Sequence, residues 1–361
     1  MILSMALYGI TYFITAIFAE GSVRLKSKKG AYFCMALVVF VPSFLAAIRY
    51  KVGTDYTNYY YLFEKAKSGV FTDMEPGYKG LMWLIARLGG SFEILSFVMM
   101  ALAMIFIYAG IVYFKKMMPV GATLFVYLML NYQQNLNLVR QAVSVAIVFY
   151  AFRFLLENKP VKYTIAILLA STIHLTALIM IPFYLIFLLF SGKYSLGVKF
   201  VGYAVMIVLV LNLSSVLEWV IKLVPSLGQY EMYINQRVEF GLGAIVIQLP
   251  YLLPGMLFYR KLTRDNPRFR FFIDLMLIGI ILRYAGYFGV YYLNRFSFYF
   301  TIPAQVLLSG CYIKAMKAYR QRWVIALLMA YVVGYWILYY GIQGASGTVP
   351  FTNIFGINLP F

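Results

Sequence analysis

Long runs of apolar residues, separated by short polar segments, recur along the whole chain. Apolar and polar positions do not alternate within these runs, so the pattern predicts helices and not the strands of a barrel. Each of the longer runs, at about 18–23 residues, can cross a hydrocarbon core as a helix. We place spans at residues 2–19, 31–48, 91–114, 119–134, 136–156, 162–174, 175–190, 197–218, 241–259, 271–293, 296–313 and 323–340. The chain is therefore predicted to be an all-α, polytopic transmembrane helical bundle of about 12 spans (10–14).

Two places in this pattern are ambiguous. The stretch PGYKGLMWLIARLGG (76–90) is apolar but short, which allows a re-entrant or an interfacial helix. The run 162–190 divides into two halves that are each short for a span, so it is either two spans or one bent element. His174 lies at the join.

Composition supports a single membrane-embedded domain over residues 1–361. Hydrophobic residues make up 63% of the chain and charged residues 12%, which excludes an ordinary soluble domain. The first run, at 2–19, has no basic residue in the opening MILSM and precedes no clear cleavage site, so we expect a retained helix and not a signal peptide. Cys34 and Cys311 both fall in apolar runs near ends that we place at the cytoplasm, and we expect no structural disulfide.

The basic residues predict which way the bundle faces. Most of the 31 lysines and arginines lie in alternate loops, at residues 24–29, 115–116, 153–162, 193–199, 260–270 and 314–322. The positive-inside rule makes these loops cytoplasmic and both termini extracytoplasmic. Residues 49–77, 219–240 and 341–361 are then near the outer face. The net charge of +19 is explained by orientation and by anionic lipid head groups, without nucleic acid.

Several basic residues lie where orientation does not require them. Arg283 is near the middle of its span, where a charge costs on the order of 3 kcal/mol and needs a partner or a cavity. The others lie near the outer ends of spans: Arg49, Lys51, Arg140 and Arg295. Guanidinium groups bind phosphate oxygens bidentately. We therefore predict a diphosphate-binding set; the alternative is that each arginine reaches head groups or pairs with a carboxylate such as Asp55.

His174 is the only histidine, and it stands in LLASTIHLTALIM at the outer end of its span. A neutral imidazole can accept a proton from a sugar hydroxyl as that oxygen attacks, which is general-base catalysis. The alternative is a histidine that only hydrogen-bonds neighbouring helices. Asp55 is the second candidate for the catalytic base.

The stretch VGTDYTNYYYLF (52–63) combines a carboxylate with four tyrosines. Aromatic faces pack against sugar rings, and polar side chains bond their hydroxyls. The candidate sugar-binding residues are Tyr56, Tyr59, Tyr60 and Gln141. An interfacial aromatic belt is the alternative explanation for the tyrosines.

A pair of acidic residues, Asp73 and Glu75, precedes the proline of TDMEPGY. The pair fits either two metal ligands or an ordinary helix start with acidic residues before a first-turn proline. We favour the helix start and expect no metal site. No nucleotide-binding loop, serine-hydrolase elbow or zinc-protease motif occurs, and no cofactor is expected.

Taken together, the chain resembles the EpsG branch of the Wzy-type polysaccharide polymerases. The matching pieces are RYKVGTDYTNYYYLF (49–63), EPGYKGL (75–81), NLVRQAVSVAI (137–147), LLASTIHLTALIMIP (168–182), NRFSFYF (294–300) and VPFTNIF (349–355). They occur in the family's order over nearly the full length, and the first and the histidine motif are the most specific. VPFTNIF departs from the pattern, because a tyrosine is expected where Phe351 stands.

The resemblance implies a glycosyltransferase of the bacterial cytoplasmic membrane that acts at the outer face. A growing glycan on undecaprenyl diphosphate would be transferred en bloc to a hydroxyl of a lipid-linked repeat unit, and lipid diphosphate would leave. The implied partners are these lipid-linked oligosaccharides, membrane lipids, and a chain-length regulator and flippase of the same pathway. Two competitors remain open: a membrane O-acyltransferase that modifies surface glycans, and a flippase for lipid-linked oligosaccharides.

Overall fold

A computed structural model describes residues 1–71, 74–191, 196–212, 215, 218–219, 222, 246–285 and 293–356. Within these residues the chain is helical, and the one extended pairing is an isolated bridge between Arg49 and Asn353. Six described helices are long and apolar enough to cross a membrane: Ile2–Arg24, Lys28–Ile48, Phe92–Tyr113, Val139–Leu156, Asn294–Ala318 and Arg322–Ile342. Shorter apolar helices cover Pro160–Ile173, Leu175–Phe190 and Gly197–Leu209. The all-α membrane fold is confirmed, whereas the count of about 12 spans and the extracytoplasmic termini stay predictions.

The chain divides into two compact units, which are described separately. The first unit contains residues 1–177 and 309–361, and the second contains residues 178–308. The prediction of a single domain over 1–361 stays a prediction. Of the outer segments predicted from the sequence, most of 219–240 and the last five residues of 341–361 lie outside the described residues.

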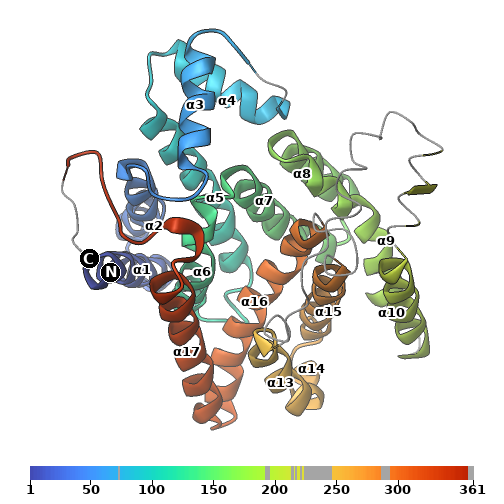
Figure 1. The fold of residues 1–361 in the computed structure, drawn as a ribbon. Coiled ribbons are helices and arrows are strands. Elements are labelled where there is room, and N and C mark those ends of the chain that lie inside the picture. The colour runs from blue at the N-terminus through green and yellow to red at the C-terminus, as the bar shows by residue number, and fades with distance from the viewer. Residues whose placement is uncertain are drawn as a thin grey trace. The chain divides into compact units, whose positions relative to one another are not determined.

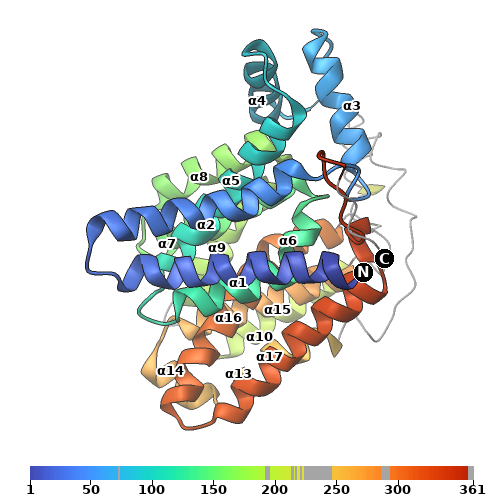
Figure 2. The same cartoon turned by 90° about the vertical axis from the view of Figure 1, so that its left-hand side faces the viewer.

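The first unit is a helical bundle. Its longer helices are α1 (Ile2–Arg24), α2 (Lys28–Ile48), α5 (Phe92–Tyr113), α6 (Val120–Asn135), α7 (Val139–Leu156), α8 (Pro160–Ile173) and α17 (Arg322–Trp336). Helix α2 packs between α1 and α5, α7 packs between α5 and α8, and α6 packs mainly against α1. Figure 2 shows α1 and α2 running antiparallel, joined by a tight turn. Short connections of this kind place consecutive apolar helices side by side.

Two short helices, α3 (Tyr56–Lys67) and α4 (Pro76–Arg87), lie side by side at one end of this unit (Figure 1). Helix α3 occupies part of the segment predicted only as an outer loop. Helix α4 is the short apolar stretch of uncertain type, and it begins at Pro76, because proline fits the first helical position. It packs against both α3 and α8. A helix of only 12 residues is too short to cross the membrane.

The segment after α17 returns to the loop that follows α2. Helix α17 continues as the π-helix η3 (Ile337–Ile342), and the 3₁₀ turn η4 (Ala345–Gly347) follows. The amide of Tyr50 donates to the carbonyl of Thr352 at 3.0 Å, and the amide of Gly53 donates to Gly347 at 2.8 Å. The buried ring of Phe351 packs edge-on against Tyr8, with centroids 5.6 Å apart. Residues 344–356 therefore hold the loop at 49–55 in place.

The second unit contains α9 (Met180–Ser191), α10 (Leu196–Leu211), α13 (Leu249–Leu257), α14 (Tyr259–Asp265), α15 (Phe269–Ala285) and the first part of α16 (Leu293–Ala318). Helices α10 and α15 are joined through Asp274, which accepts from Lys199 Nζ at 2.6 Å and from the Tyr203 hydroxyl at 2.8 Å. The paired carboxylate explains how apolar helices accommodate these charges.

Candidate functional site

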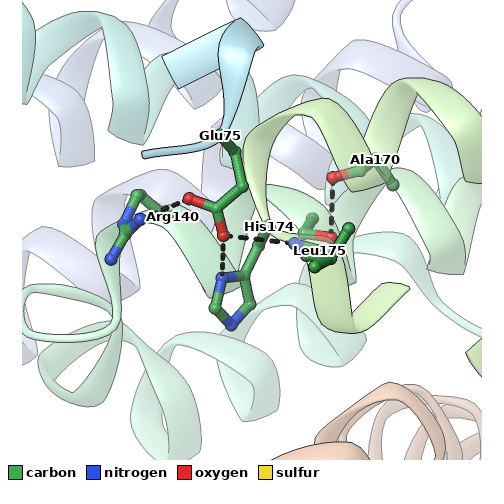
Figure 3. A network of polar contacts seen from close by, with 6 residues as sticks. Glu75, Arg140, Ala170, His174 and Leu175 are labelled. Carbon is green, nitrogen blue, oxygen red and sulfur yellow. Dashed lines mark hydrogen bonds and ion pairs between the residues drawn. The ribbon is translucent and has the colours of Figure 1, made fainter. Parts of the chain in front are cut away.

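Glu75 is the centre of a polar network in the first unit. It immediately precedes α4, and its carboxylate faces α7 and the end of α8 (Figure 3). One oxygen forms an ion pair with Arg140. The other lies 3.0 Å from Nδ1 of His174 and accepts the backbone N–H of Leu175 at 3.2 Å. The network thus joins three segments that are distant in the sequence.

The local backbone explains why His174 points at this carboxylate. Helix α8 ends at Ile173, His174 is extended (φ −153°, ψ 113°), and the 3₁₀ helix η1 (Leu175–Ile179) follows. The first N–H groups of a new helix have no partner within it. Glu75 supplies an acceptor for one of them, at Leu175. The break that the sequence predicted at His174 is therefore confirmed and is stabilised by a carboxylate from another element.

Gly77 allows α4 to approach α8 closely enough for this contact. A Cβ atom at Gly77 would lie 2.5 Å from Oγ1 of Thr172 and 2.8 Å from the Thr172 carbonyl oxygen. Those separations are shorter than van der Waals contact, so any larger residue would push α4 away from α8. Gly80, on the same helix, has open space at its Cβ position. Of these two glycines in EPGYKGL, the first is needed for the close approach.

The charge state of Glu75 determines which nitrogen of His174 carries the proton. Burial raises the pKa of Glu75, but the hydrogen bond from His174 and the charge of Arg140 lower it, and the resulting pKa is about 2. The carboxylate is therefore ionised at neutral pH and can only accept. His174 must donate from Nδ1, so in the neutral ring Nε2 carries a lone pair. Nε2 is buried and has no hydrogen-bond partner among the described residues.

Arg140 lies in the first turn of α7 between aromatic rings and the carboxylate. Its guanidinium carbon is 5.6 Å from the centroid of the Tyr78 ring, and it hydrogen-bonds Tyr59. Its side chain is 26% exposed, and its buried Nε has no hydrogen-bond partner in the described part of the chain. Donors of this kind can bind the oxygens of an anionic ligand. The structure thus brings together His174, Arg140 and Tyr59 of the predicted site residues.

Arg49 makes different contacts. It is 2% exposed, and its Nη1 donates to the carbonyl of Leu136 at 2.6 Å and to that of Val52 at 3.2 Å. Its guanidinium carbon is 5.5 Å from the centroid of the Tyr56 ring. Because Leu136 follows the last residue of α6, the cation lies where a helix terminus carries partial negative charge. Arg49 therefore fastens the loop to α6, and diphosphate binding by Arg49 stays a prediction.

The other predicted residues near this loop and on α7 have their own environments. Asp55 is half-buried and lies 3.4 Å from the Thr54 hydroxyl, and exposed Lys51 stacks its ammonium over the Tyr50 ring. Tyr60 is exposed and stacks on Tyr56. Gln141 is buried beside Arg140 on α7. Their roles as base and sugar-binding residues stay predictions.

Arg283 and Arg295 belong to the second unit, on α15 and α16. Both side chains are partly exposed. Binding of one anionic ligand by Arg295 together with Arg49 and Arg140 is not tested by these contacts and stays a prediction.

Glu75 is the N-cap residue of α4, as the helix-start interpretation predicted, but sequence reasoning gave it no part in the candidate site. Asp73, the other member of the acidic pair in TDMEPGY, lies outside the described residues. The partners of Glu75 are 65 and 99 residues away along the chain, so no local pattern connects them. A usable signal was present in EPGYKGL, where a carboxylate stands next to a proline and a glycine that fix its position.

Comparison with known proteins places this network in a family. The EpsG family model matches residues 32–353. The chain belongs to the EpsG family. No curated protein and no solved structure matches it.

The EpsG match includes the three side chains of the network, Glu75, Arg140 and His174. Membership in the EpsG family, together with the membrane-length helices, identifies a polysaccharide-polymerase-like membrane protein with a glycosyltransferase-like activity.

Proposed function

We propose that this EpsG-family chain polymerises undecaprenyl-diphosphate-linked oligosaccharide repeat units into a long-chain surface polysaccharide. The reaction takes place at the outer face of the bacterial cytoplasmic membrane. The donor is the growing glycan on its lipid diphosphate, and the acceptor is a hydroxyl of a second lipid-linked unit. Family membership supports the reaction class, and the Glu75–His174 pair supports the chemistry.

In the proposed step, the acceptor oxygen forms a bond to the anomeric carbon of the donor glycan. The bond between that carbon and the diphosphate oxygen breaks, and the leaving diphosphate keeps the electron pair. The hydroxyl proton passes to Nε2 of His174, which is the free nitrogen when Nδ1–H donates to Glu75. Glu75 orients the ring and stabilises the imidazolium that forms.

Arg140 is proposed to stabilise the negative charge that develops on the leaving diphosphate. Its Nε lacks a partner among the described residues, so the guanidinium has capacity beyond its contact with Glu75. A fixed cation in a site of low dielectric stabilises such charge more than it would in water. Tyr59 and Tyr78 hold the guanidinium in place through its aromatic contacts.

The observation that carries the proposal is the buried histidine nitrogen without a hydrogen-bond partner, on a ring held by an ionised carboxylate. A histidine that only joined helices would use both of its nitrogens, since a buried polar atom without a partner is costly. The unused atom is therefore the one expected to take part in the reaction.

The test uses purified protein in lipid nanodiscs with lipid-linked repeat units, and glycan length is read by gel ladder. Wild type should produce a ladder with EDTA present, whereas His174→Gln should lose about 10²–10⁴-fold in rate and still bind the lipid-linked unit. Near-native polymerisation by His174→Gln would remove the base and make Asp55 the next candidate. A strict need for a divalent ion would reject the arginine account of the leaving group.

The same experiment separates the competing functions. An O-acyltransferase would transfer an acyl mass to the unit without lengthening it, and a flippase would move it across the bilayer unchanged. Mass spectrometry of the product distinguishes polymerisation from acyl transfer. A flippase would leave the mass unchanged and is detected in sealed liposomes, by which leaflet holds the lipid-linked unit.

A further inference from the structure

A groove of about 480 Å³ lies at the end of the first unit away from Glu75. It is lined by the last turn of α1, the segment between α5 and α6, and the end of α16, all within the first unit. Helix α5 packs against α4, which follows Glu75, and the groove is lined by residues that come just after the end of α5, a helix of 22 residues or about 33 Å. The first residue of α5, Phe92, contacts Tyr56 and Tyr60 of α3, so the groove lies at the opposite end of α5 from α3 and α4.

The groove is strongly basic. Four of its lining residues carry positive charge, at Arg24, Lys115, Lys314 and Lys317. The one carboxylate, Glu20, is already used: it pairs with Arg24 at 2.6 Å and accepts the N–H of Gly121 at 2.7 Å. The positive charge that remains on the three lysines is not balanced by a carboxylate within the described residues.

Three of these cations, Lys115, Lys314 and Lys317, have no ion-pair partner in the described chain. Lys314 donates to the carbonyl of Lys116, so part of its capacity serves the fold. Lys115 and Lys317 form no ion pair among the described residues, and both are exposed. Their ammonium groups are available to an anion from outside the chain.

The remaining lining of the groove is apolar and includes Val23, Met118 and Ile313. A free inorganic anion would be bound by charge alone and would gain nothing from this wall. A ligand with a phosphate next to hydrocarbon would use both. The groove also lies at the ends of α1 and α16, two helices of membrane-crossing length, which is the depth of lipid head groups.

We propose that this groove binds the phosphate head group of an anionic glycerophospholipid, with the glycerol and upper acyl chain against the apolar wall. Lys115 and Lys317 contact the phosphate, and Arg24 and Lys314 add charge around it. Basic pockets between membrane helices select anionic over zwitterionic lipids for this electrostatic reason. The site does not depend on the proposed polymerase reaction.

The test is native mass spectrometry of the full-length protein with phosphatidylglycerol or phosphatidylcholine of identical acyl chains. The variant Lys115→Gln/Lys317→Gln removes two charges from the groove, and Lys26→Gln/Lys29→Gln removes two exposed charges from the α1–α2 turn nearby. Wild type and the control should retain phosphatidylglycerol preferentially. The groove variant should bind it about 30-fold more weakly, at about 1 kcal/mol per basic residue.

Equal retention of phosphatidylglycerol by the two double variants would overturn the proposal, because the preference would then reflect the overall positive charge.

A second experiment adds inorganic phosphate or glycerol 3-phosphate as a competitor. Displacement of the lipid by either at low millimolar concentration would assign the groove to a soluble phosphate and reject the lipid. The melting temperature in lipid-free detergent shows whether the groove variant is folded. If the double variant melts at a lower temperature than wild type, the single variant Lys317→Gln replaces it, and about fivefold weaker binding of phosphatidylglycerol is expected.

Discussion

Arg49 and Arg140 are two arginines of the same unit in opposite situations. Arg49 is 2% exposed and donates to backbone carbonyls at the end of α6. Arg140 is 26% exposed and faces a carboxylate, which also holds the only histidine. Arg49 uses its Nη1 to hold the backbone, whereas Arg140 is paired with a side chain of the candidate site. The buried Nε of each has no hydrogen-bond partner among the described residues. The difference shows that the role of an arginine near the end of a membrane helix depends on which acceptors it contacts and not on its position in the sequence.

The largest effect should come from removing the charge that distinguishes the Arg140 region. Glu75→Gln keeps an acceptor for Leu175 N–H but loses the charge facing His174 and Arg140, so polymerisation should fall by about 10²-fold or more. The ladder assay measures this. Glu64→Gln, a partly exposed carboxylate on α3 that pairs with Lys67, is the matched control and should retain activity. Equal activity in the two variants would mean that Glu75 is only a structural residue.

The next experiment exchanges both arginines for lysine. Arg49→Lys should lower the free energy of unfolding by about 1–3 kcal/mol, because the lysine ammonium ends one bond short of Nη1, which donates to both carbonyls, and lacks the planar group that faces the Tyr56 ring. Arg140→Lys should leave the melting temperature nearly unchanged and reduce the rate about tenfold, since charge remains but the fork is lost. Thermal melting in detergent and the ladder assay separate the two. If Arg49→Lys has the melting temperature of wild type but loses polymerase activity, the structural role given to Arg49 is wrong.

A smaller effect is expected from moving the carboxylate without changing it. Gly77→Ala places a methyl group against Thr172 and should displace Glu75 from His174, with about a tenfold loss of rate. Gly80→Ala, on the same helix, should be neutral or stabilise by up to about 1 kcal/mol, because alanine favours helix. Full activity in Gly77→Ala would show that the approach of α4 to α8 does not position the site.

The smallest effect concerns pH. The pKa of Glu75 is lowered to about 2 in the folded protein, so its charge stabilises the fold fully above its ordinary value near 4.5. That stabilisation is lost as pH falls from there toward 2. The difference in melting temperature between wild type and Glu75→Gln should be constant from pH 7 to 5 and narrow below about 4.5. A gap that already narrows between pH 7 and 6 would contradict the lowered pKa.

The sequence predicted most of the helices because membrane helices are apolar on every side. It missed α3, which is built from polar and aromatic residues; yet its buried Tyr56, Tyr59, Phe63 and Ala66 have helical spacing, which was a readable signal. It also predicted the break at His174, because both halves of that run are short.

Only part of the candidate site could be predicted from the sequence. His174 and Arg140 stood out because a lone histidine and an unexplained arginine are conspicuous in an apolar chain. The role of Arg49 could not be predicted, because its acceptors are backbone carbonyls, which every residue carries. Glu75 was missed because its importance depends on a pairing across 99 residues, which only the folded chain shows.

The segment 344–356 also has a consequence for how the protein is made. Its hydrogen bonds to the loop after α2 join residues 302 positions apart, as between Thr352 and Tyr50. At about 5–20 residues per second, a ribosome needs roughly 15–60 s to travel that distance. Throughout this interval the newly made loop around Arg49 lacks the segment that later holds it in place. A quality-control protease that surveys unfinished membrane proteins would therefore find this loop unsecured until residues 344–356 have been made.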